Sequence, residues 1–163
     1  MEERDPVRVE VKPIGLVRRT SADEDVKDKR LVSRVVLDED LCPALDGIAD
    51  FSHVFVIYWL HQVGRAKEPV LHHPGIQGEA QPVGILATRA PIHPNPIGLT
   101  LVELVKREGN TLWVKGLDAH DGTPVLDNKP YPDWERGRLI VVTDVRIPEW
   151  LRRIVSPAPW PPA

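Results

Sequence analysis

Two short stretches of this chain carry the side chains whose types and spacing suggest chemistry. The first, residues 88–99, places Arg89, His93 and Asn95 on a loop that also contains Pro91, Pro94 and Pro96. Each proline fixes its own φ and pushes the preceding residue towards an extended conformation, so the loop is stiff before any ligand arrives. A stiff loop that carries a guanidinium, an imidazole and an amide is suited to bind a ligand, because part of the ordering entropy is already lost.

The second stretch, residues 118–131, brings carboxylates, a turn and a basic residue close together. Asp-Gly at residues 121–122 is a turn signal, so Asp118, Asp121 and Asp127 are expected on or beside a tight connection between two strands. These carboxylates could accept a proton during a reaction, although a carboxylate in a turn usually caps its own backbone. Taken alone, each stretch is more simply explained as an ordinary strand connection.

Several segments around these stretches alternate between apolar and polar residues, as strands do. Residues 51–60 form an apolar run that is too rich in β-branched and aromatic residues to prefer a helix. We expect strands at residues 7–18 (with a bend at Pro13), 31–37, 51–60, 83–87, 99–105, 111–117 and 139–145. The hairpin formed by residues 99–105 and 111–117 is expected to supply core side chains, namely Leu101, Val105, Leu112 and Val114. Short helices are predicted from Asp38 and from Pro148.

Strands therefore outnumber helices, and the fold class that we expect is mainly β. The chain is predicted to form a small single-domain β-barrel with one or two short helices over residues 1–147. A short helix and a proline-rich tail would follow at residues 148–163, because Ser-Pro-Ala-Pro-Trp-Pro-Pro-Ala cannot form a regular helix or a central strand.

Two long loops interrupt the strand pattern. Residues 18–30 have no apolar period and are predicted to form a surface loop, solvated from Asp23 to Arg30. Residues 63–82 contain His72 and His73, which we expect at the surface.

Six histidines make a zinc or iron site conceivable, but the chain lacks a His-x-x-x-His helix, a His-Glu-x-x-His motif and a cysteine partner. We therefore expect no metal site.

Composition narrows the class of protein. A chain of 163 residues can bury a sizeable core as one domain, and the single cysteine, Cys42, excludes an intramolecular disulfide. No apolar stretch reaches the ~18 residues of a membrane helix, and the first five residues are too charged for a signal peptide. We expect a cytoplasmic protein with no membrane contact. The formal charge of −3 gives no support for a general nucleic-acid binder, so any RNA contact must be local.

Several motifs together resemble one known family. They are Thr88-Arg89-Ala90-Pro91, Pro94-Asn95-Pro96-Ile97-Gly98, Gly116-Leu117-Asp118, Asp121-Gly122-Thr123-Pro124-Val125-Leu126-Asp127 and Lys129-Pro130-Tyr131, with Ile14-Gly15-Leu16-Val17 and Phe51-Ser52-His53 upstream. From about residue 13 to residue 147 the chain is similar to the TrmO family, also called TsaA-like or YaeB-like proteins. The resemblance implies an S-adenosylmethionine-dependent methyltransferase built on a small β-barrel that forms homodimers. It implies as substrate the N6 nitrogen of threonylcarbamoyladenosine just 3′ of the anticodon, so the expected partner is the anticodon loop of tRNA.

The resemblance also implies where the cofactor would bind. Family members contact it just after the first strand and near the end of the central strand, which fall here on Thr20, Ser21, Ala22, His61 and Gln62. The bidentate guanidinium of Arg89 suits a carboxylate, either that of the cofactor or that of the modified base. Leu99 would belong to an apolar rim around the adenine. Backbone groups of the second motif would read the edge of the adenine, from His120, Asp121, Gly122, Thr123 and Pro124.

The chemistry of methyl transfer and the family resemblance also suggest which residues would contact the methyl acceptor. Asp118, Asp121 or Asp127 would take the proton from the attacking nitrogen or hold the loop, and Asp121 and Asp127 are the expected catalytic carboxylates. His93 and Asn95 on the stiff loop are expected to contact the substrate. Lys129 and Tyr131 would contact RNA phosphate and stack on a base.

The chain departs from the family pattern in three ways. Ala90 stands where Ser is common, His93 stands where Arg precedes Pro-Asn-Pro, and Asn128 replaces the usual Ile. His93 exchanges a permanent cation for a group of a type that titrates near neutrality. Longer bacterial members continue into a C-terminal domain. Two alternatives therefore stay open: a methyltransferase of a small molecule or another RNA, and a non-catalytic ligand-binding module.

Overall fold

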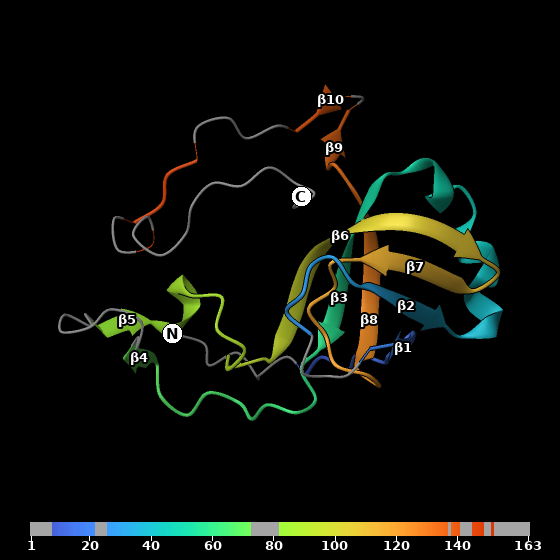
Figure 1. The fold of residues 1–163 in the computed structure, drawn as a ribbon. Helices are drawn as coiled ribbons and strands as arrows, with labels where there is room; N and C mark the ends of the chain where they lie inside the picture. The colour runs from blue at the N-terminus through green and yellow to red at the C-terminus, as the bar shows by residue number, and fades with distance from the viewer. Residues whose placement is uncertain are drawn as a thin grey trace.

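A computed structural model describes residues 8–21, 26–72, 82–136, 138–140, 145–148 and 151. Its main body is a closed barrel of six antiparallel strands (Figure 1). Around the barrel the order is β1 (Gly15–Arg19), β2 (Val32–Leu37), β7 (Thr111–Lys115), β6 (Ile97–Glu108), β3 (His53–Trp59) and β8 (Pro124–Tyr131), which returns to β1. The prediction of a small, mainly β barrel is confirmed.

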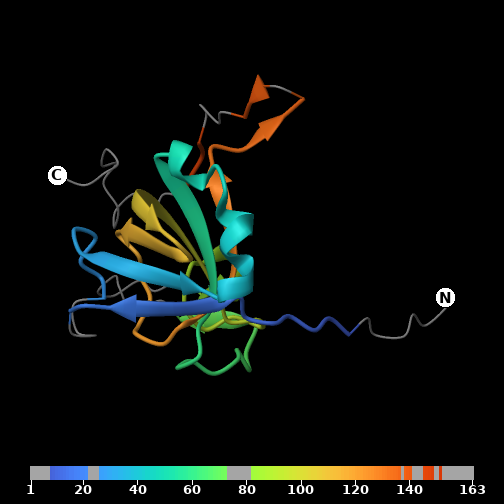
Figure 2. The same cartoon turned by 90° about the vertical axis from the view of Figure 1, so that its right-hand side faces the viewer.

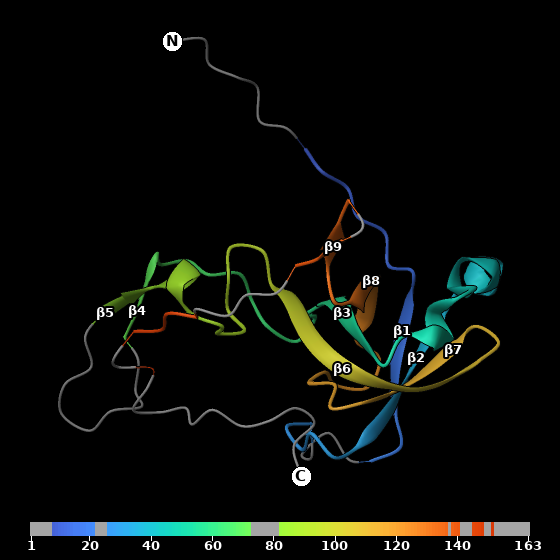
Figure 3. The ribbon, with the colours of Figure 1, turned by 90° about the horizontal axis from the view of Figure 1, so that it is seen from above.

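Shorter elements lie outside the barrel. The strand β4 (Val70–His72) pairs with β5 (Pro82–Gly84), and β9 (Trp134–Glu135) pairs with β10 (Arg138–Leu139). Seen from above, the β4–β5 pair lies well to one side of the barrel (Figure 3). Three short 3-10 helices complete the described elements: η2 (Glu39–Leu45), η3 (Ile48–Asp50) and η4 (Ile85–Ala87). The helix predicted from Asp38 is thus present in 3-10 form, and with η3 it runs along one side of the barrel (Figure 2).

Alternate side chains of the barrel strands point inward and form one core. In β3 the inward residues are Val54, Val56 and Tyr58, while His53, Phe55, Ile57 and Trp59 face outward. The other strands contribute mainly β-branched and leucine side chains, which suit a pleated surface buried on one face. The fully buried members are Val17, Val35, Val54, Val56, Val102, Leu112, Val114 and Val125.

The β6–β7 hairpin forms as predicted across residues 108–110, but half of its expected core was wrong. Leu112 and Val114 are buried, whereas Leu101 is half-buried and Val105 is 48% exposed. Val102 and Leu104 point inward instead. Both alternating sets of this segment contain apolar residues, so alternation alone could not choose the face. Pairing with β3 chose it, since Leu101 lies opposite the outward Phe55.

Three predicted strands are shorter than expected. Residues 8–14 form no strand, and the chain joins the barrel where the Ile14 amide donates to Val125 O at 2.8 Å. The strand expected at residues 83–87 ends at Gly84 and continues as η4. Of residues 139–145, only Leu139 belongs to a strand, and residues 141–144 lie outside the described residues. Most of the predicted C-terminal helix and tail also lies outside them.

Candidate functional site

The pairing of β6 with β7 covers only part of β6. The β7 register starts at Glu103, opposite Lys115, so residues 97–102 are paired on one edge with β3 and have no β7 partner on the other. The chain turns away after Lys115 at Gly116, whose φ of 90° favours glycine. We call this region, between residues 97–102 of β6 and residues 116–120, the seam.

Backbone groups of β6 face the seam. The Leu60 amide donates to Pro96 O and the Leu104 amide donates to Ser52 O, both at 2.8 Å, so the even-numbered residues of β6 are the ones that bond β3. The N–H and C=O groups of the odd-numbered residues Leu99 and Leu101 therefore point to the opposite edge. In agreement, Nη2 of Arg89 donates to Leu99 O at 2.7 Å.

A cavity of about 870 Å³ opens at the seam. It is lined by the β1–β2 loop, the end of β3, residues 88–93, the start of β6 and residues 118–123. These segments are far apart in sequence and meet because the barrel closes. A cavity of this size is large enough for a small organic ligand.

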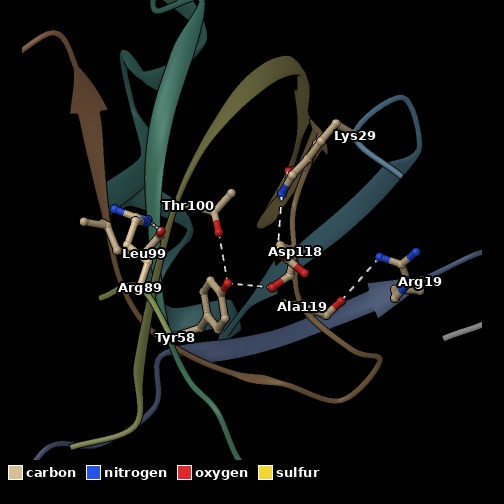
Figure 4. Close-up of polar contacts among 9 residues, drawn as sticks. Arg19, Lys29, Tyr58, Arg89, Leu99, Thr100, Asp118 and Ala119 are labelled. Carbon is tan, nitrogen blue, oxygen red and sulfur yellow. Dashed lines mark hydrogen bonds and ion pairs between the residues drawn. The ribbon is translucent and has the colours of Figure 1, made fainter. Parts of the chain in front are cut away.

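Tyr58 joins the two sides of the seam at the floor of this cavity (Figure 4). Its hydroxyl donates to Asp118 O at 2.6 Å and lies 2.9 Å from Oγ1 of Thr100 on β6. Its ring packs against Gly98, where an added Cβ would lie 2.2 Å from Cε2 of the ring. Gly98 is therefore required for the close packing of Tyr58. Burial raises the pKa of Tyr58, so its hydroxyl keeps its proton at neutral pH.

Cations outnumber carboxylates around the cavity. Lys27, Lys29 and Arg89 line it, and Asp118 is the single acidic residue among its described lining. Nζ of Lys29 donates to Gly116 O at 3.1 Å and lies 3.7 Å from a carboxylate oxygen of Asp118. Burial lowers the pKa of Lys29, and Asp118 opposes this effect. The surplus of positive charge suits a ligand with an anionic group.

Residues 23–134 match the model of the tRNA-methyltransferase O N-terminal domain. The chain belongs to this family. Its relatives include a probable S-adenosyl-L-methionine-binding protein of Methanothermobacter thermautotrophicus, 39% identical over 130 residues that cover 77% of this chain and 91% of that protein. The tRNA (adenine(37)-N6)-methyltransferase of Mus musculus is 42% identical over 88 residues, which cover 54% of this chain but 20% of the mouse protein.

A solved TrmO structure from Pseudomonas aeruginosa has the same fold. It superposes with a TM-score of 0.62 at 29% sequence identity, covering 86% of this chain and 62% of the TrmO chain. A second TrmO structure gives a TM-score of 0.67 at 30% identity and is covered to 64%. This chain thus spans somewhat less than two thirds of the solved TrmO chains that it matches.

Seven of the residues predicted for binding meet at the cavity of this TrmO-family barrel. From the cofactor set these are His61, Gln62, Arg89, Leu99, His120 and Thr123, and from the substrate set His93. Nε2 of His93 is buried and has no hydrogen-bond partner among the described residues. Oγ1 of Thr123 lies 3.4 Å from Nδ1 of His61, which joins the second motif to the end of β3.

The other predicted residues lie elsewhere. Ser21 accepts a hydrogen bond from Nη2 of Arg19 at 3.0 Å, and Ala22 lies outside the described residues. Asp121 lies at the tip of the turn next to the cavity, where its carboxylate accepts from the Arg19 amide at 2.8 Å. Thr20, Asn95, Gly122 and Pro124 also do not line the cavity.

Asp127, Lys129 and Tyr131 lie on the outer face of β8. The carboxylate of Asp127 pairs with the ammonium of Lys129 at 2.8 Å, and the ring of Tyr131 contacts Phe55 edge to face at 5.7 Å. A register shift in the pairing of β8 with β3 follows Ile57, so Val125 points inward while Asp127 faces out. The assignment of Asp127 as a catalytic group stays a prediction.

Lys29, Tyr58 and Thr100 were not among the predicted site residues. Lys29 belongs to the segment that we expected to be fully solvated, yet it lines the cavity and is half-buried. Tyr58 and Thr100 lie in apolar strands, and nothing local distinguishes them from core residues. Only the strand pairing could have indicated Tyr58. It ends the row of inward side chains of β3, and the hydroxyl of a buried tyrosine needs a hydrogen-bond partner.

Within the described ranges, no three His, Cys, Asp or Glu side chains lie close enough together to hold a metal ion. The same part of the chain contains no helix that is long and apolar enough to cross a membrane.

Proposed function

We propose that this chain is an S-adenosylmethionine-dependent methyltransferase that modifies the N6 nitrogen of an adenosine in tRNA. The observation that carries the proposal is the convergence of both sequence motifs on one cavity, with Arg89 and His93 from the first and His120 and Thr123 from the second. Membership of the TrmO N-terminal-domain family supports it, as do the relatives described as S-adenosyl-L-methionine-binding proteins and as a tRNA (adenine(37)-N6)-methyltransferase. The finer acceptor that we propose is threonylcarbamoyladenosine beside the anticodon, and the cytoplasm is the proposed location.

The cavity fits the methyl donor in size and chemistry. At about 870 Å³ it lies within the range of small-molecule sites. The guanidinium of Arg89 and the ammonium of Lys29 are suited to the carboxylate of the donor. The backbone N–H groups of Leu99 and Leu101 and the C=O group of Leu101, on the open edge of β6, are suited to the edge of an adenine. When bound, the cofactor supplies a methyl group on a positively charged sulfur.

The residues of this chain bind the cofactor, orient the methyl acceptor and take up the proton that the acceptor loses. Methyl transfer needs the acceptor nitrogen in line with the methyl group, so rigid walls contribute most of the catalysis. The proline-rich loop holds Arg89 and His93 on one wall, and Nε2 of His93 has no hydrogen-bond partner among the described residues. Of the three aspartates of the second motif, Asp118 lines the cavity, so we assign the uptake of the N6 proton to its carboxylate. Asp121 and Asp127 then support the turn and the outer face of β8.

A homodimer is part of the proposal. The outer face of β3, β6 and β8 gathers partly exposed apolar side chains, namely Phe55, Ile57, Trp59, Ile97, Leu99, Leu101 and Tyr131. An apolar sheet face of this kind is what a stable interface covers. Light scattering should then give a mass twice the 18.3 kDa of one chain, reduced towards 18.3 kDa by Phe55→Glu. A monomer at tens of micromolar would contradict the dimer.

The test of the cofactor site is thermal unfolding with S-adenosylmethionine or S-adenosylhomocysteine. A ligand present at about 100 times its dissociation constant adds ~2.7 kcal/mol to the free energy of unfolding. We expect both ligands to raise the midpoint, and Arg89→Ala to reduce the rise. No rise with either ligand, for folded protein free of bound cofactor, would overturn the methyltransferase proposal.

The test of the acceptor is methyl incorporation into two matched tRNA preparations, one unmodified and one carrying threonylcarbamoyladenosine. We expect incorporation only into the modified tRNA. His93 favours a second candidate, a methyl acceptor other than tRNA, because the family commonly has arginine there. Incorporation into nucleosides or metabolites but into neither tRNA would select that candidate.

A further inference from the structure

The hydroxyl of Tyr58 is one member of a directed chain of hydrogen bonds across the seam (Figure 4). A tyrosine hydroxyl has a single proton, and Tyr58 donates it to Asp118 O at 2.6 Å. The 2.9 Å contact with Thr100 must then run from the Thr100 hydroxyl to the oxygen of Tyr58. The direction is therefore fixed, from β6 through the end of β3 to the second motif.

This hydrogen-bond chain lies where the barrel lacks a strand ladder. On most of the barrel, backbone hydrogen bonds between neighbouring strands set their spacing. Residues 97–102 have no such bonds to β7, so side chains must set the distance between β6 and residues 116–120. Tyr58 connects those two segments directly, and all three members of the chain line the cavity.

The position of Tyr58 in its strand shows that the hydroxyl is not needed to fill the core. The two preceding inward residues, Val54 and Val56, are apolar and fully buried. Tyr58 continues this row to the floor of the cavity and is 4% exposed. A phenylalanine would fill the same space, whereas the hydroxyl adds only the bonds to Thr100 and Asp118.

We propose that Tyr58 is a positioning residue of the methyl-transfer site, whose hydroxyl sets the spacing between the open edge of β6 and the Asp118–His120 segment. The inference rests on the proposed function, because it assigns Tyr58 to the cofactor cavity. Tyr58 acts through the carbonyl of Asp118, and so places the Asp118 carboxylate and His120 opposite Arg89. Without the hydroxyl, the two walls are free to separate.

The test is calorimetric titration of the full chain with S-adenosylhomocysteine. Wild-type binding first establishes the cofactor site, independently of Tyr58. We then expect Tyr58→Phe to weaken affinity by about 3- to 10-fold, the effect of one or two lost hydrogen bonds. A purely structural role would lower the thermal midpoint and leave the dissociation constant unchanged. Ile48→Val, a truncation of a buried residue that does not line the cavity, controls for loss of stability and should leave affinity unchanged.

A second pair of variants tests whether the hydrogen bonds run from Thr100 through Tyr58. Thr100→Val removes the donor to Tyr58 and keeps the side-chain shape, and Thr111→Val is the matched control in β7, outside the cavity. Because Thr100 acts through Tyr58, the double variant Tyr58→Phe/Thr100→Val should bind about as well as the weaker single variant. Wild-type affinity in folded Tyr58→Phe, or full additivity of the two effects, would overturn the inference while leaving the proposed function in place.

Discussion

The ammonium of Lys29 lies 3.7 Å from a carboxylate oxygen of Asp118 and donates to the carbonyl of Gly116. Lys29 comes from the loop between β1 and β2, whereas both partners follow β7. The contact therefore holds the β1–β2 loop against the wall of the cavity, although the charged sequence of this loop predicted that it would be solvated.

This contact predicts a specific pH dependence of stability. Burial lowers the pKa of Lys29 in the folded protein below the 10.5 of a free lysine. Between those two values the unfolded chain holds a proton that the folded chain has lost, so the contribution of Lys29 to the free energy of unfolding rises with pH in that window. We expect the stability difference between wild type and Lys29→Met to move in favour of wild type as pH rises towards 10.5, measured by urea unfolding. Lys106→Met controls for removal of a surface lysine, and a difference that moves the other way would contradict the burial of Lys29.

Gly98 should not tolerate even a methyl group. An added Cβ would lie 2.2 Å from Cε2 of Tyr58, so the buried ring must move. We expect Gly98→Ala to lower the free energy of unfolding by ~1 to 3 kcal/mol, as other overpacked cores do. Gly64→Ala is the matched control, because no heavy atom lies within 4 Å of its added Cβ. Equal midpoints in chemical denaturation for the two variants would show that the packing of Tyr58 on Gly98 is not as described.

His93 should matter more for the acceptor than for the cofactor. Its Nε2 is buried at the cavity without a partner in the described part of the chain, and a substrate group could supply that partner. We expect His93→Ala to raise the KM for tRNA about tenfold, the value of one good hydrogen bond, with little change in affinity for S-adenosylhomocysteine. Ile92→Ala, an exposed neighbour that does not line the cavity, is the control. An unchanged KM would remove His93 from the substrate site.

Asn128 should be a site where an apolar residue stabilises the barrel. It lies opposite the inward Val56, and its Oδ1 is buried with no hydrogen-bond partner among the described residues. Since an unpaired buried acceptor costs ~1 to 3 kcal/mol, we expect Asn128→Leu to raise the free energy of unfolding by about 1 kcal/mol. Asn110→Leu should do the opposite, because the Asn110 amide donates to Leu37 O at 2.6 Å. Destabilisation by both variants would indicate that Asn128 makes a bond in solution.

Much of the fold follows from local pattern. Richness in β-branched and aromatic residues predicted the strand at residues 51–60. Alternation predicted the strand at residues 31–37, because a strand that is buried on one face leaves that signature in its sequence. It could not orient residues 99–105, where both alternating sets contain apolar residues. Nor could it show that residues 8–14 form no strand, since alternation describes a strand and not its partner.

The two motifs, and through them the family, were likewise determined by the sequence alone. Prolines and an Asp-Gly turn restrict the backbone locally, so the loops that carry Arg89, His93, His120 and Thr123 could be found without a structure. The tertiary structure decided which side chains meet. The cavity forms because β7 ends at Lys115 and β8 begins only at Pro124, which leaves residues 97–102 of β6 without a β7 partner on one edge. Lys29, Tyr58 and Asp118 are brought together across that unpaired edge by the closure of the barrel, a non-local constraint that no stretch of sequence records.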